Sequence, residues 1–117
     1  MIGRLHATIA FWLFAAGAGA ASADATAMCL DDDDNSAAQC ACATEALAAE
    51  VGAEDAGFYD MVGTRYLANR KDEQGMAESW DAAIADTAAE AGMGSIALLT
   101  RMNAVGTAHR SAIKACR

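Results

Sequence analysis

The amino-acid sequence predicts a small all-α protein, an up-and-down bundle of about four helices held together by two disulfides. Three observations lead to this prediction. Apolar residues recur at steps of three and four over most of residues 36–117, which is the period of an amphipathic helix. The chain has no proline and is rich in alanine, the residue with the highest helix propensity. Its four cysteines all follow a stretch typical of an export signal.

Residues 1–23 have the three parts of a secretory signal peptide. Arg4 supplies the positive charge, residues 7–21 are an apolar run, and Ala-Ser-Ala at 21–23 gives the small side chains that a signal peptidase requires before Asp24. Cleavage two residues later is an alternative. The apolar run is shorter than the roughly twenty residues needed to span a bilayer. We therefore expect a cleaved bacterial precursor and a mature protein that is periplasmic or secreted, without a membrane span.

The charge of the chain limits its partners. Residues 24–117 keep all 16 acidic residues and seven of the eight basic ones, a net charge of −9. Such a charge repels nucleic acid and anionic lipid, so no nucleic-acid partner is expected. An acidic run at 31–34 and an acid-free basic stretch at 101–117 are interpreted as helix-dipole complementarity and solvation.

Residues 24–35 are expected to be an irregular acidic segment, and residues 36–117 the helical domain. The first helix begins after a cap at Asn35 or Ser36, and Gly52 follows its end. The third begins at Asp72 as N-cap, and the fourth begins at Ser95 as cap. The four predicted helices cover residues 36–51, 54–69, 72–91 and 95–117.

The apolar stripes of these helices give the expected core. Its members are Cys40, Ala43, Leu47 and Val51, then Phe58, Met61, Val62, Tyr66 and Leu67, then Met76, Trp80, Ala83, Ile84, Thr87 and Ala91, and finally Leu99, Met102, Gly106, His109, Ile113 and Cys116. Few of these side chains are large, so covalent crosslinks are expected to stabilise the domain.

The cysteines Cys29, Cys40, Cys42 and Cys116 are expected to form two disulfides, because an even number in a small exported domain is typical of such a framework. Cys40 and Cys42 cannot pair with each other, since residues two apart on a helix point about 200° apart. Cys40 shares its face with Leu47, and Cys116 lies on the inward stripe of the last helix. We therefore predict Cys40–Cys116 as the long bridge and Cys29–Cys42 as the short one.

His109 is the only histidine after residue 23. It lies one helical turn from Ile113 on an apolar stripe, so we expect a buried side chain with a structural role. A pH-sensing role is the sharper alternative.

A metal site is the other alternative that the sequence leaves open. The Cys40-x-Cys42 pair and the methionines of residues 24–117 could bind copper or zinc. The methionines at 61, 76 and 102 fall on apolar stripes, however, and are interpreted as core residues. The acidic run at 31–35 begins like a calcium-binding loop, but Ser36 stands where that loop requires glycine.

No spacing typical of a catalytic, cofactor or metal site stands out, so we expect no enzyme, no cofactor and no metal ion. The sequence favours an exported, non-enzymatic helical protein of the bacterial envelope that binds or stabilises another protein. The alternative is a periplasmic metal-handling protein that uses cysteine and methionine ligands for copper or zinc.

Overall fold

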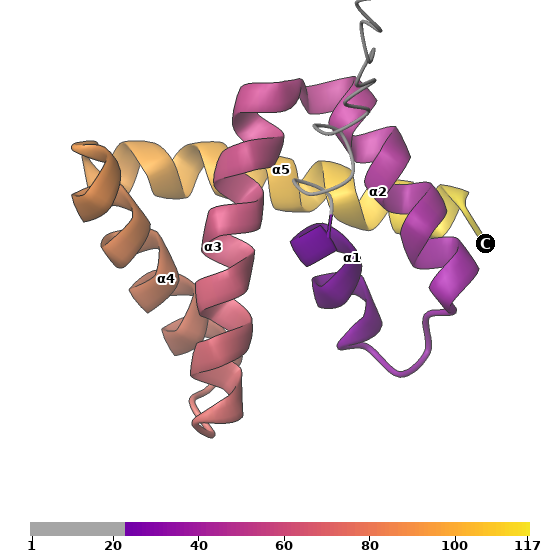
Figure 1. Ribbon diagram of the computed structural model, residues 1–117, viewed down its shortest axis with the longest axis horizontal. Coiled ribbons are helices and arrows are strands. Elements are labelled where there is room, and N and C mark those ends of the chain that lie inside the picture. Colours follow the sequence, from indigo (N-terminus) through magenta and orange to yellow (C-terminus); the bar gives the residue numbers. More distant parts are fainter. Residues whose placement is uncertain (1–22) are drawn as a thin grey trace, which may run out of the picture.

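The computed structural model describes residues 23–117, which form five α-helices and no strand (Figure 1). The helices are α1 (Ala23–Leu30), α2 (Ala37–Val51), α3 (Ala53–Lys71), α4 (Met76–Ala91) and α5 (Ser95–Ala115). The all-α class and the presence of two disulfides are confirmed. The signal-peptide prediction lies outside the described residues, apart from its last position. Of the helices in the described range, none has the length and apolarity that crossing a membrane requires.

The helices α3 and α4 run side by side as an antiparallel pair, and α5 crosses behind α3 and α2 (Figure 1). The short helix α1 packs against both α2 and α3. The long helix α5 contacts α2, α3 and α4, so it connects α2 with the α3–α4 pair.

The core lies where these helices meet. Its fully buried large side chains are few, and alanines fill the positions between them. The buried apolar cluster consists of Ala25, Leu47, Tyr59, Val62, Ala83, Ile84, Ala88, Leu98, Met102 and Val105. Small side chains let the helices approach closely, but each one removes little apolar surface from water.

The start of α2 is fixed by a reciprocal cap. Gln39 donates its backbone N–H to the Ser36 hydroxyl (3.1 Å), and its side-chain oxygen accepts from the Ser36 N–H (3.3 Å). The Gln39 amide also donates to the carbonyl of Ile113 (2.9 Å), which ties the start of α2 to the last turn of α5. The expected cap at Ser36 is therefore confirmed, and it has a tertiary role as well.

The N-terminal segment differs from the prediction. Residues 23–30 form α1 instead of irregular chain, and the acidic turn begins only at Asp31. The segment is alanine-rich, and its buried residues Ala25 and Cys29 lie against neighbouring helices. Eight residues show little periodicity by themselves, so tertiary packing stabilises this helix more than its own propensity does.

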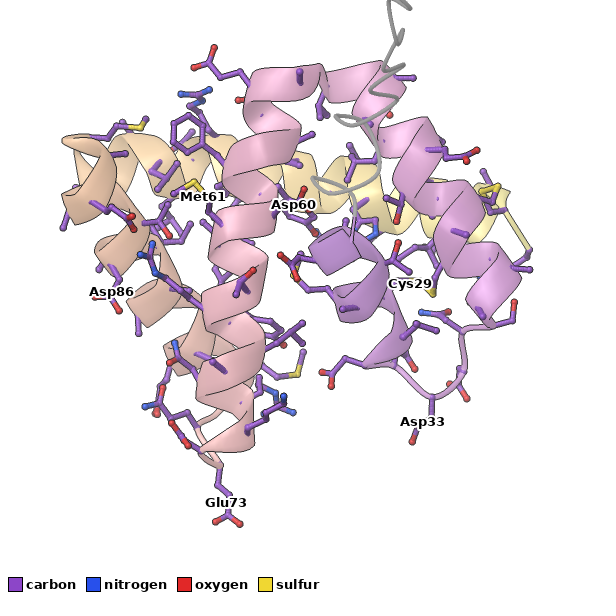
Figure 2. All side chains as sticks on the ribbon, in the orientation of Figure 1. Cys29, Asp33, Asp60, Met61, Glu73 and Asp86 are labelled. Carbon is purple, nitrogen blue, oxygen red and sulfur yellow. A yellow bond between two sulfur atoms is a disulfide. The ribbon has the colours of Figure 1, made fainter. Side chains whose placement is uncertain are left out.

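The connection between α3 and α4 also differs. Asp72 was predicted as the N-cap of the later helix, whereas it is the C-cap of α3, and α4 begins only after Gly75. Glu73 adopts a left-handed backbone with φ of 63° at the tip of this turn, where Figure 2 shows it pointing away from the domain. Arg70 donates to the carbonyl of Gln74 (2.9 Å). Basic residues in the last turn of α3 favour its continuation to residue 71.

Candidate functional site

The disulfides are Cys29–Cys40 and Cys42–Cys116, with Cα–Cα distances of 5.6 and 6.0 Å. The predicted pairing, Cys40 with Cys116 and Cys29 with Cys42, is therefore wrong. All four cysteines are bonded, as expected, and no free cysteine remains in the described part of the chain.

The disulfide pairing was predicted wrongly because a different helix contacts the inward face of α2. Cys40 points inward as predicted and is fully buried, and Cys42 points outward. Because α1 packs against α2 and α3, the inward cysteine meets the buried Cys29, which Figure 2 shows near the end of α1 that faces α2. The C-cap residue of α5, Cys116, then meets the outward Cys42.

Both bridges bear on the metal alternative. A thiolate is the form of cysteine that binds soft metal ions, and none of these sulfurs can supply one while the bridges are intact. Residues 23–117 also contain no group of three or more His, Cys, Asp or Glu side chains placed to hold a metal ion. The cysteine part of the metal alternative is therefore not supported.

An open cleft of about 580 Å³ lies between α1, α3, α4 and α5. Its lining combines aromatic rings, methionines and a few polar groups. The lining residues are Met28, Tyr59, Tyr66, Met76, Ala77, Trp80, Met102, Asn103, Gly106, Thr107 and Arg110. A volume of this size is typical of ligand sites, so the cleft is the candidate functional site.

Three aromatic side chains form one wall of the cleft. The ring of Trp80 stands edge-on to Tyr59 at 6.1 Å and to Tyr66 at 5.9 Å between centroids. Such T-shaped contacts are the preferred geometry for aromatic pairs. The Trp80 indole N–H donates to Asn103 Oδ1 (3.0 Å), which fixes the ring relative to α5. The wall is therefore held in place before any ligand binds.

Methionines from three helices line the same cleft: Met28 from α1, Met76 from α4 and Met102 from α5. Of these three, only Met102 is a core residue, and its predicted place in the core is confirmed. Met76 is 65% exposed, so its interpretation as a core residue is wrong, and so is that of Met61, which is 39% exposed and lies outside the cleft. Methionine side chains adapt to ligands of different shape because they are unbranched and polarisable.

Arg110 supplies a positive charge at the edge of the cleft. Its side chain is exposed and donates to the Thr107 hydroxyl (3.1 Å). The arginines Arg65 and Arg101 form ion pairs with carboxylates, whereas Arg110 has no carboxylate partner among the described residues. Its guanidinium is therefore available to an anionic group of a ligand.

His109 is buried, as predicted, and only 3% exposed. Its Nδ1 lies 2.8 Å from the Tyr59 hydroxyl. Burial, with a smaller contribution from the nearby charge of Arg110, lowers the pKa of His109. Burial raises the pKa of Tyr59 as well, so the pair is neutral at pH 7. His109 stands behind the cleft wall and supports Tyr59, which lines the cleft.

Asp60 is another buried polar residue, and no pattern in the sequence predicted its burial. Its side chain lies on the side of α3 that faces α1 (Figure 2). Burial raises its pKa to about 6, against a hydrogen bond from the Ala25 backbone that lowers it. The only indication of its burial in the sequence is its position directly after Tyr59, in a helix of mixed polar and apolar residues.

Comparison of the chain with protein-family models, with curated proteins and with solved structures gave no match. The chemistry of the cleft and of the buried polar groups therefore carries the functional proposal.

Proposed function

We propose that this chain is an exported, non-enzymatic protein of the bacterial envelope that binds another protein by holding one of its apolar segments in the cleft. The observation that carries this proposal is the composition of the lining. Three aromatic rings and three methionines surround an open hollow of about 580 Å³. Aromatic residues and methionine are enriched where proteins bind one another, and methionine-rich surfaces accept segments of varied shape.

Charge complementarity defines the partner more closely. Arg110 is the basic residue of the cleft and lacks a carboxylate partner within the described residues. A segment that carries one acidic group next to its apolar side chains fits both features. The expected ligand is thus a short peptide segment with leucine or phenylalanine side chains and a single carboxylate.

Export is the second part of the proposal. Both disulfides involve residues that follow the predicted signal peptide, and disulfides persist in oxidising compartments such as the periplasm. The expected cleavage before Asp24 leaves the cleft-lining residue Met28 and both bridges within the mature chain.

The fluorescence of Trp80 gives a direct test. Trp12 lies in the predicted signal peptide, so Trp80 is the sole tryptophan of residues 24–117, and it lines the cleft. We expect its emission to change on titration with a synthetic peptide that has leucine and phenylalanine side chains and one glutamate. The same peptide with glutamine in that place should bind about two- to fivefold more weakly, the range of an exposed ion pair.

Two variants complete the test. Arg110→Gln should reduce the affinity for the glutamate peptide to that for the glutamine peptide, whereas Arg117→Gln, at the chain end outside the cleft, should change neither. Peptides that leave Trp80 emission unchanged and show no binding by calorimetry would contradict the proposal. Equal effects of the two arginine variants would contradict the role of Arg110.

A soft-metal site is a second candidate, and one observation favours it. The thioethers of Met28, Met76 and Met102 come from distant parts of the sequence to one cleft, and thioethers bind Cu(I). If copper binds there, Met76→Leu weakens Cu(I) binding, and Met61→Leu, an exposed methionine outside the cleft, does not. Equal Cu(I) affinities for both variants and the unchanged protein would exclude this site.

A further inference from the structure

Asp60 accepts a hydrogen bond from the start of a helix that is distant in sequence. The backbone N–H of Ala25, in the first turn of α1, donates to Asp60 Oδ1 (3.2 Å). The Asp60 side chain is only 7% exposed, and its second oxygen, Oδ2, is buried without a hydrogen-bond partner among the described residues. A buried carboxylate oxygen without a partner is costly, so Asp60 is suited to a further donor.

The neighbouring residue Asp24 is also anchored to α3. Thr64 donates its hydroxyl to the carboxylate of Asp24, and the backbone of Asp24 directly precedes the nitrogen that Asp60 binds. Consecutive backbone nitrogens lie less than about 4 Å apart. The nitrogen of Asp24 therefore lies close to Asp60 at the N-terminus of α1. The contact of the Asp24 side chain with Thr64 and that of the Ala25 backbone with Asp60 hold it there.

This nitrogen is the one that the predicted cleavage would release. We propose that removal of the signal peptide before Asp24 creates an α-ammonium group that forms a buried ion pair with Asp60. The inference rests on the proposed export of the protein. It assigns to Asp60 a specific ligand, the new N-terminus of its own chain, and makes processing a step that completes the fold.

The chemistry of the step is hydrolysis by a signal peptidase. Water is consumed, the bond between the carbonyl carbon of Ala23 and the nitrogen of Asp24 breaks, and Ala23 leaves with the new carboxylate. The amine left on Asp24 takes up a proton near neutral pH, because α-amino groups have pKa values of about 7.7–8.0. The resulting ammonium can donate a hydrogen bond to Asp60 Oδ2, which has no donor among the described residues.

Helix electrostatics make the proposal specific. The N-terminus of a helix carries partial positive charge and so disfavours an ammonium group there. Without Asp60, the pKa of this amine should therefore lie at or below the ordinary range. A raised pKa would report the negative charge of Asp60, together with that of Asp24 itself.

The test uses protein exported and processed by a bacterial host, with intact mass identifying its first residue. An amine-acylating reagent is applied over a range of pH, and labelling of the α-amine is followed by mass spectrometry of the N-terminal tryptic peptide. The side chains of Lys71 and Lys114 serve as internal references. The labelling midpoint of the α-amine should lie at least one pH unit above the ordinary range, which makes labelling at pH 7 at least tenfold slower.

The variant Asp60→Asn should lower the midpoint toward the ordinary range, and Asp86→Asn, on α4 in Figure 2, should not change it. An ordinary midpoint in the unchanged protein overturns the ion pair even if Asp60→Asn does not fold. A mature mass that begins elsewhere, or a full-length mass, overturns the processing site, and the full-length mass also contradicts the proposed export. A chain that begins at Asp24 with an ordinary amine contradicts only this inference.

Discussion

The Tyr59 hydroxyl lies 2.8 Å from Nδ1 of His109 and joins α3 to α5 inside the core. The two rings stand edge-on at 5.4 Å between centroids. Both side chains are at most 5% exposed, so water does not compete for the hydrogen bond. The pair positions the Tyr59 ring, which forms part of the cleft wall. A buried polar contact thus links core stability to the geometry of the candidate binding site.

Removing the Tyr59 hydroxyl should destabilise the protein. Tyr59→Phe keeps the ring but leaves Nδ1 of His109 buried without its partner, at a cost of about 1–3 kcal/mol in the free energy of unfolding. Tyr66→Phe is the matched control, because Tyr66 packs on the same Trp80 ring and its hydroxyl forms no hydrogen bond with the described residues. Urea denaturation measures both variants. Equal midpoints for the two would refute the role of the hydrogen bond.

The lowered pKa of His109 predicts a pH dependence of stability. The unfolded chain takes up a proton on this residue near its ordinary value of about 6.5, and the folded protein does so only at lower pH. The stabilisation is therefore fully present above the unfolded value and is lost as the pH falls below it.

Comparison with His109→Gln isolates this contribution. Asp60 and Arg110 are present in both proteins, so their effects largely cancel in the difference. The free energy of unfolding, measured by denaturant between pH 7.5 and 5, should fall more steeply for the unchanged protein than for the variant. Parallel pH profiles for the two proteins would show that His109 titrates normally in the folded state.

The sequence predicted the long helices best where a helical period and a glycine stop occur together. Gly52 and Gly92 have φ of 87° and 67°, values that favour glycine, and each marks the end of a predicted helix. The buried positions of α5 include Met102, Gly106 and His109, as the stripe indicated. Helical periods and glycine stops were sufficient to predict features whose physical cause lies within one helix.

The parts that sequence could not predict depend on long-range packing. The phase of α2 was correct, but the partner of Cys40 depends on whether α1 or α5 covers that face. The cleft joins Met28, Trp80 and Arg110, which come from three helices. No periodicity within one helix indicates which side chains of another helix lie opposite it.

The observed disulfides give a connectivity test. Trypsin cleavage after Lys114 leaves a short C-terminal fragment that carries Cys116, and this fragment should remain attached through Cys42. In protein alkylated before digestion, Cys42→Ser should release the fragment, and Cys40→Ser should not. Release by the Cys40 variant alone would restore the pairing that the sequence suggested.

The two bridges should differ in their effect on stability. Replacing Cys42 and Cys116 together by serine opens a loop with a sequence separation of 74, worth about 4–5 kcal/mol in the chain-entropy model. Replacing Cys29 and Cys40 opens one of 11, worth about 3 kcal/mol in the same model. Denaturant unfolding of the two double variants measures the difference. A larger loss for the short bridge would mean that burial of Cys29 and Cys40 outweighs the chain entropy.

Two glycines of α3, Gly57 and Gly63, form a matched pair of substitution sites. Alanine at either one raises helix propensity, but only alanine at Gly63 contacts a residue that lines the cleft. A Cβ at Gly57 meets nothing within 4 Å, so Gly57→Ala should raise the free energy of unfolding by about 0.5–1 kcal/mol, the usual gain within a helix. A Cβ at Gly63 lies 2.7 Å from Cε of Met28. Gly63→Ala therefore has the same intrinsic gain but must displace the end of that side chain.

Because Met28 lines the cleft, this displacement should also affect binding. Gly63→Ala should be less stabilising than Gly57→Ala and should alter Trp80 emission and the affinity for the glutamate peptide. Gly57→Ala should leave both unchanged. The thermal midpoint and the fluorescence titration are measured on the same samples. Equal stabilisation with unchanged binding in both variants would show that Met28 moves freely and does not shape the cleft.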